Sequence, residues 1–128
     1  MNATTSRTRR ATRRTLRARL RTRAAQHRLV ASVRRRPRSL TTVCLAAGVD
    51  REAASGTANG LRSVAKRLAL TPATTARTRR TVHGGRHHQT HTVTRWTLGQ
   101  VQVLIRAYKP RKPEYKAAVA RLAALCTA

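Results

Sequence analysis

Five polar side chains between residues 51 and 66 are spaced so that they share one side of a helix. They recur at steps of four or three: Arg51, Ser55, Asn59, Arg62 and Lys66. These residues offer hydrogen-bond donors, acceptors and positive charge. The apolar positions of the same stretch recur at similar steps on another side: Ala54, Ala58, Leu61, Val64 or Ala65, and Leu68. One face therefore packs against the protein and the other can contact a partner.

Catalytic chemistry is hard to place in this chain. Its only acids are Asp50, Glu52 and Glu114, so paired carboxylates for acid–base work are missing. We find neither a nucleophile with a matching His and Asp nor a glycine-rich phosphate loop. We therefore expect no enzyme, no cofactor and no small-molecule substrate.

The polar face belongs to a segment, residues 40–68, that is typical of two helices joined by a tight turn. Thr41 is a suitable N-cap for a first helix of about seven residues, and Gly48 suits its end. Asp50 is a good N-cap for a second helix beginning at Arg51.

The charge of the chain requires a polyanion. Twenty-nine Lys and Arg against three acids give a net charge of +26, which internal ion pairs cannot balance. Nucleic acid is the favoured partner and anionic lipid the alternative. No apolar run approaches 18 residues and no signal peptide is evident, so we expect a cytoplasmic, nucleoid-associated protein without membrane contact. The Arg-rich, Ala- and Thr-rich composition is typical of a GC-rich, actinobacterial genome.

The N-terminal third is basic throughout. We expect residues 1–14 to be disordered in free solution and residues 1–21 to form a basic arm, largely disordered or helical, that contacts phosphates. A helical pattern begins at Thr15 and continues to Arg36, before Pro37.

A β-hairpin is expected after the second helix of the pair. Residues 71–83 suit one strand and residues 90–98 the other, with Trp96 anchoring the hairpin on the helices. The arginines along it are Arg77, Arg79, Arg80, Arg86 and Arg95. Near the tip are His83, His87, His88 and His91, which match no zinc motif, and we expect no metal there.

Two short helices should follow the hairpin. Thr97 and Gln100 form a capping box for one, and Pro113 suits the first turn of the other. These helices could cover their own core or pair across a two-fold axis in a homodimer. Cys44 and Cys126 are expected to be buried thiols, since two distant cysteines indicate neither a disulfide framework nor a zinc site.

The sequence LAAGVDRE, followed by an amphipathic helix, resembles the helix-turn-helix of bacterial DNA-binding proteins. With the hairpin, residues 22–98 resemble a winged helix-turn-helix domain, and residues 99–128 form a helical extension. The resemblance implies a mainly α fold with a small β-hairpin wing. It also implies that base edges meet Arg51, Ser55, Asn59 and Arg62, and that phosphates meet Thr41, Thr42, Lys66, Arg77, Arg79, Arg80, Arg86 and Arg95. Gly56 and Gly60 depart from the pattern, and a kink or an irregular first turn is expected there.

The function implied is duplex-DNA binding, as a transcriptional regulator or as a plasmid or phage replication, partition or transfer factor. Two alternatives use the same charge without base reading. One is a nonspecific nucleoid-type protein, and the other is an RNA- or ribosome-associated basic protein.

Overall fold

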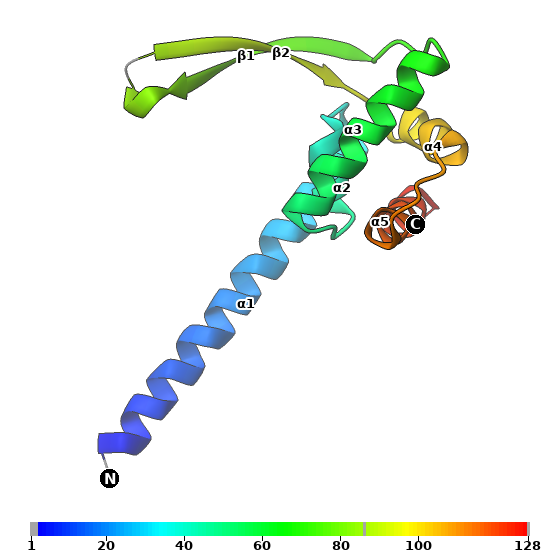
Figure 1. Cartoon of the computed structure of the whole chain (residues 1–128). Coiled ribbons are helices and arrows are strands. Elements are labelled where there is room, and N and C mark those ends of the chain that lie inside the picture. The colour runs from blue at the N-terminus through cyan, green and yellow to red at the C-terminus, as the bar shows by residue number, and fades with distance from the viewer. Residues whose placement is uncertain (1–2, 86, 128) are drawn as a thin grey trace.

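The chain folds into a small helical body from which two extended segments project (Figure 1). The computed structural model describes residues 3–85 and 87–127, and of residues 3, 80–83, 87 and 88 it describes the backbone alone. The elements in chain order are α1 (Ala3–Arg35), α2 (Leu40–Ala46), α3 (Arg51–Arg67), β1 (Thr74–Val82), the short turn η1 (His83–Gly85), β2 (His87–Arg95), α4 (Leu98–Ala107) and α5 (Pro113–Thr127). The expectation of a mainly helical fold with a small hairpin is thus confirmed at this coarse level.

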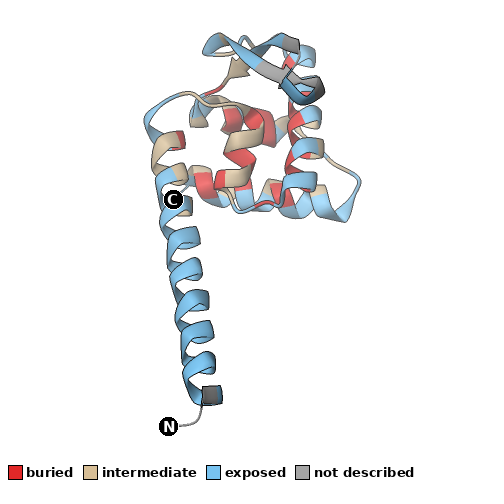
Figure 2. Ribbon diagram, turned by 90° about the vertical axis from the view of Figure 1, so that its left-hand side faces the viewer, coloured by how far each residue is buried: buried red, intermediate tan, exposed pale blue. Residues whose placement is uncertain are grey.

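The core lies where the end of α1 meets α2, α3, α4 and α5 (Figure 2). Its largest fully buried side chains are Leu40, Leu61, Leu104, Leu122, Val43, Val101, Thr57 and Cys44. Helices α4 and α5 cover this core with Val101, Leu104, Ala118 and Leu122. The C-terminal helices therefore complete the core of their own chain, which was one of the two arrangements left open by the sequence.

Helix α1 begins at Ala3, not near Thr15 as the hydrophobic pattern indicates. In the structure residues 3–14 are helical, not disordered. The sequence between Ala3 and Arg35 contains neither Gly nor Pro, so nothing interrupts the helix. Threonine hydroxyls along it donate to carbonyls four residues back, as Thr8 does to Thr4 at 2.9 Å and Thr12 does to Thr8 at 3.0 Å. Residues 4–25 of α1 are exposed, because α1 leaves the body there.

The corner between α2 and α3 follows the expected turn, with one correction. Ser39, and not Thr41, is the N-cap of α2, because its Oγ accepts a hydrogen bond from the Thr42 amide. Gly48 has φ of 87°, which a glycine adopts without strain. Helix α3 begins at Arg51 as predicted, although the Asp50 side chain makes no capping hydrogen bond. From α5, Arg121 donates to the Gly48 carbonyl at 2.6 Å and ties the corner to the C-terminal helix.

The two glycines inside α3 neither kink nor shorten it, since it runs as one helix from Arg51 to Arg67. They instead leave room for two tyrosine rings. A Cβ on Gly56 would lie within 3.0 Å of the Tyr115 ring, and one on Gly60 would lie equally close to Tyr108. The expectation of a kink or an irregular first turn was wrong, because the cost of glycine is offset here by packing.

This contact leads to a test of stability. We expect Gly56→Ala and Gly60→Ala each to lower the free energy of unfolding by about 1–3 kcal/mol through overpacking against the tyrosine rings. A gain in helix propensity of about 1 kcal/mol offsets only part of that loss. Urea unfolding followed by circular dichroism measures the change.

Gly99→Ala is the matched control, since the nearest atom to its new Cβ is Thr97 Oγ1 at 3.9 Å. We expect that helix substitution to be neutral or stabilising. If Gly60→Ala were as stable as Gly99→Ala, the tyrosine contact would not hold α3.

Strands β1 and β2 form an antiparallel hairpin in which Thr74 pairs with Arg95 and Arg80 with Gln89. Gly84 and Gly85 adopt φ of 64° and 93° at the turn. The second strand spans His87–Arg95 instead of the expected residues 90–98, because Thr97 caps α4 and Leu98 begins it.

Trp96 is the anchor of the hairpin, as predicted. Its side chain is buried, and its backbone forms a two-way bridge with Arg38, with N–O distances of 2.8 and 3.0 Å. Arg38 lies in the connection between α1 and α2, so the base of the hairpin is tied to the segment that leads into α2. Two strands alone are marginal in water, and this attachment supplies the missing support.

The predicted signals for the last two helices are confirmed. Thr97 Oγ1 accepts from the Gln100 amide, and the Gln100 side chain accepts from the Thr97 amide, which completes the capping box. Helix α5 begins at Pro113. Both cysteines of the chain carry free thiols; Cys44 is buried and Cys126 half-buried.

Candidate nucleic-acid interface

One face of α3 is exposed and polar. Seven exposed polar residues lie on it: Arg51, Glu52, Ser55, Asn59, Arg62, Ser63 and Lys66. Helical spacing places them on one continuous arc, while Ala54, Ala58 and Leu61 point into the core. The structure thus brings together the four residues proposed to meet base edges, Arg51, Ser55, Asn59 and Arg62, with Lys66 among them.

Two of these side chains form a hydrogen bond with each other. Arg62 Nη1 donates to Asn59 Oδ1 at 2.8 Å on the surface of α3. A partner that uses either side chain must break or share this hydrogen bond, at a net cost of about 1 kcal/mol for an exposed pair. The pair also fixes the directions of the two side chains before any partner arrives.

Thr41 and Thr42 lie in the first turn of α2 and are half-buried. The Thr42 hydroxyl is 2.8 Å from Ser39 Oγ, so it takes part in the cap. Thr41 has no such role, and its place at the start of α2 leaves it the better candidate for a phosphate contact.

The hairpin arginines do not form a single row. Arg77 and Arg79 are exposed on one face of the hairpin, because alternate residues of a strand share a face. Arg95 pairs with Thr74 and lies on the other face, half-buried. The side chain of Arg80 and the whole of Arg86 lie outside the described part of the molecule.

Of the histidines near the hairpin tip, His91 is exposed. The side chains of His83, His87 and His88 are not among those described. Within the described residues no group of three or more metal-ligating side chains comes together.

Helix α1 carries a regular row of arginines that was not predicted from the sequence. Because the helix is continuous, residues seven apart align along one side of it, drifting by about 20° per repeat. Arginines occupy five such positions and two between them: Arg7, Arg14, Arg21, Arg28 and Arg35, with Arg10 and Arg17. All seven are exposed. We call them the arginine row.

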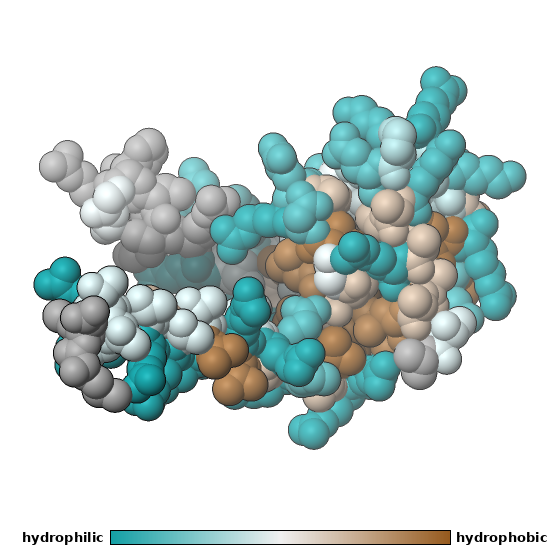
Figure 3. Space-filling view, turned by 90° about the horizontal axis from the view of Figure 1, so that it is seen from below, coloured by the Kyte–Doolittle hydropathy of each residue, from teal (hydrophilic) through white to brown (hydrophobic). Residues whose placement is uncertain are grey.

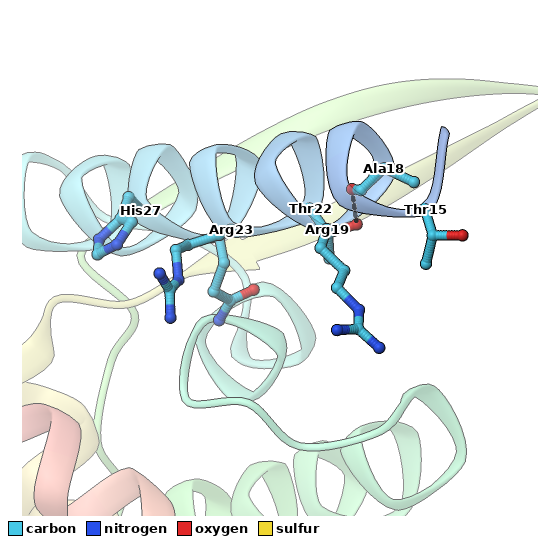
Figure 4. Close-up of a pocket in the computed structure, with 7 residues that line it drawn as sticks. Thr15, Ala18, Arg19, Thr22, Arg23 and His27 are labelled. Carbon is cyan, nitrogen blue, oxygen red and sulfur yellow. Dashed lines mark hydrogen bonds between the residues drawn. The ribbon is translucent and has the colours of Figure 1, made fainter. Parts of the chain in front are cut away.

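Gln26 holds α1 against the corner of the helix pair. Its Nε2 donates to the Leu45 and Ala46 carbonyls of α2, at 3.1 and 2.8 Å. A hollow of about 550 Å³ lies along α1 beside this attachment, lined by Thr15, Ala18, Arg19, Thr22, Arg23, Gln26 and His27 (Figure 4). Within the hollow the Thr22 hydroxyl donates a hydrogen bond to the Ala18 carbonyl. The other polar side chains that line it are Thr15, Arg19, Arg23, Gln26 and His27.

Both projections, α1 and the hairpin, lie to the left of the body in the views of Figures 1 and 3, but they leave from different ends of it: the hairpin lies at the top and α1 runs downward (Figure 2). The hairpin follows α3 in the chain, and its base is bridged through Trp96 to Arg38, close to the end of α1.

The cysteines add no reactive chemistry to this surface. Burial raises the pKa of the Cys44 thiol to about 11, against the smaller opposing effect of the Arg62 charge. Burial also raises the pKa of Cys126. Both are therefore neutral thiols at pH 7, and nucleophilic or redox chemistry would need the thiolate.

Among the described residues, every helix is too short or too polar to cross a lipid bilayer.

Comparison with protein-family models, with curated proteins and with solved structures finds no match for this chain.

Proposed function

We propose that the protein binds duplex DNA in the manner of a winged helix-turn-helix domain and is not an enzyme. In this arrangement α3 lies in the major groove, where Arg51, Asn59 and Arg62 meet base edges. Arg77 and Arg79 of the hairpin and the arginine row of α1 meet phosphates. Small proteins of this kind act as transcriptional regulators or as replication or transfer factors of mobile elements.

The observation that carries the proposal is the exposed face of α3. It combines arginine, asparagine and serine side chains on an unkinked helix whose other side is packed in the core. Base recognition needs such rigid presentation of bidentate donors and acceptors. The net charge of +26 supplies the phosphate attraction that base contacts alone do not.

Binding should first be tested on the purified full chain with a pool of random duplexes. Selection from the pool, followed by anisotropy titrations of a selected and an unselected duplex over a range of salt, measures the specificity ratio. We expect the selected duplex to bind at least about a thousandfold more tightly. Equal affinity at every salt concentration would exclude base reading by α3.

Single substitutions should separate base contacts from phosphate contacts. We expect Arg51→Ala or Asn59→Ala to reduce discrimination between selected and unselected duplexes by about 1–3 kcal/mol. Arg79→Ala should weaken both duplexes alike and lower the salt slope by about 1.

If neither Arg51→Ala nor Asn59→Ala alters discrimination, α3 does not read bases. Asn59→Ala needs one check, because it also releases Arg62 from its hydrogen bond. Arg62→Ala, made in parallel, shows whether the freed arginine accounts for the change.

The arginine row also supports a second candidate, a nonspecific nucleoid-type or RNA-associated protein. A row of charge along an exposed helix reads no sequence and fits any polyphosphate. Competition between the unselected duplex and structured RNA of equal length decides between duplex DNA and RNA, since the favoured partner displaces the other at lower concentration.

A further inference from the structure

We propose that the connection between α4 and α5 forms a further phosphate-binding surface beside α3, which we call the flank. It acts in addition to the hairpin and α1. The flank consists of Lys109 and Lys112 with Arg67 and Arg106, and its ligand is the sugar–phosphate backbone of the duplex bound to α3. This inference rests on the proposed function and assigns a further part of its interface.

The contacts of Tyr108 and Tyr115 with α3 position this connection along the helix. Tyr108 ends α4 and packs on Gly60, while Tyr115 in the first turn of α5 packs on Gly56. The chain between the tyrosines, residues 109–114, is therefore held at both ends against α3. Pro110 and Pro113 restrict its backbone, so little conformational freedom remains to be lost on binding.

The flank borders the exposed polar face of α3. Helical spacing puts Gly56 and Gly60 at one edge of that face, next to Ser63, and puts Ala58 and Ala65 at the opposite edge. Helix α2 packs against α3 on its buried side. A duplex on the polar face therefore meets the connection on one side of α3, where one backbone wall of the groove would pass.

A cleft of about 820 Å³ opens at this edge, lined by Gly60, Ser63, Val64, Arg67, Arg106, Ala107, Tyr108 and Lys109. Arg67 Nη2 donates to the Ala107 carbonyl at 3.1 Å, and this hydrogen bond positions the Arg67 guanidinium at the cleft. Arg67, Arg106 and Lys109 are exposed. Three cations around one cleft, with no acid in its lining, suit a phosphodiester.

Lys112 extends the flank toward the middle of α3. Its Nζ lies 5.7 Å from the centre of the Tyr115 ring, which in turn rests on Gly56. Two of the three acids, Asp50 and Glu114, line a separate cleft with Arg121 at the N-terminal end of α3. The third, Glu52, lies in the first turn of α3, near the same end. The positive flank therefore runs from the middle of α3 to its C-terminal end.

The test uses the full chain and an unselected 25-base-pair duplex, so that no target sequence has to be known. Anisotropy titrations across a range of salt compare the wild type with Lys109→Gln, Lys112→Gln and the double variant. We expect each single variant to lower the slope of log affinity against log salt by about 0.9 and to weaken binding about five- to tenfold at 0.1 M salt. The double variant should show both losses together.

Lys116→Gln is the matched control. Lys116 is an exposed lysine of α5 whose helical position lies opposite the buried Ala118 and Leu122, so it points away from α3. We expect its slope to equal that of the wild type. Lys109→Arg and Lys112→Arg keep the charge and should restore binding, while melting temperatures confirm that every variant folds.

Three results would overturn the inference. Slopes for Lys109→Gln and Lys112→Gln equal to those of the wild type and Lys116→Gln would remove the flank from the interface and leave the function proposed for α3 standing. Failure of the wild type to bind any duplex would remove both. A loss shared equally by all three glutamine variants would reduce the effect to overall charge and would also contradict the flank.

Discussion

Trp96→Ala is expected to lower the free energy of unfolding by about 3–5 kcal/mol, the loss found for large aromatic side chains removed from a core. Trp96 is buried at the base of the hairpin, and its backbone bridges Arg38. Against a total stability of about 5–15 kcal/mol, such a loss leaves a small margin. Urea unfolding monitored by circular dichroism measures it, because the variant has no tryptophan left to follow.

Trp96→Phe is the control, since a phenyl ring refills most of the site. We expect it to lose less than half as much stability, together with the indole hydrogen bond to Thr94 Oγ1 at 3.2 Å. The hairpin should also detach in Trp96→Ala, seen as faster hydrogen exchange of the residue 96 amide. Unchanged stability and unchanged exchange would show that the hairpin is held by its own strands.

The second large effect concerns the arginine row of α1. Replacing Arg7, Arg14 and Arg21 by glutamine is expected to lower the salt slope of duplex binding by up to about 2.7, and affinity at 0.1 M salt by about 10²–10³-fold. These residues align because α1 is one continuous helix, and their exposed guanidinium groups can each meet a phosphate. Anisotropy titrations over a range of salt, with one unselected duplex, give both quantities.

The matched control removes the same charge from the other side of the same helix. Arg9, Arg19 and Arg23 lie roughly opposite the row by helical spacing. We expect their replacement by glutamine to weaken binding less than about tenfold, through long-range attraction alone. Equal losses in the two triple variants would mean that α1 acts as a diffuse positive charge and not as an aligned surface.

The row also bears on how α1 stays helical. Arg10, Arg14 and Arg17 are spaced three and four apart, so like charges repel along one side of the helix. Threonine hydroxyls that donate to backbone carbonyls offer little support in return. A bound polyanion would relieve this repulsion and would stabilise the helical form of α1.

The sequence predicted the elements whose ends are set by local chemistry. Gly48 and Asp50 placed the start of α3 at Arg51, and Thr97 with Gln100 placed the start of α4. The burial of Trp96 followed from strand alternation. Each of these predictions depends on residues within a few positions of one another, where hydrogen bonding and backbone preference decide the outcome.

Other predictions failed where a neighbour in space overrides a local preference. Gly56 and Gly60 indicated a kink, but α3 runs straight through them. Two tyrosines from beyond the hairpin fill the space they leave. Thr41 also suits an N-cap, but Ser39 caps α2, and Leu40, the first residue of that helix, is buried in the core.

The sequence alone was enough to predict a highly cationic, mainly helical protein with a capped helix pair, a hairpin and one polar helix face. Charge and periodicity are properties of the chain and need no third dimension. Only the tertiary structure decided that the C-terminal helices cover the core and that Lys109 and Lys112 lie beside α3. Both arrangements depend on contacts between residues far apart in the chain, such as Tyr108 with Gly60, which no local pattern records.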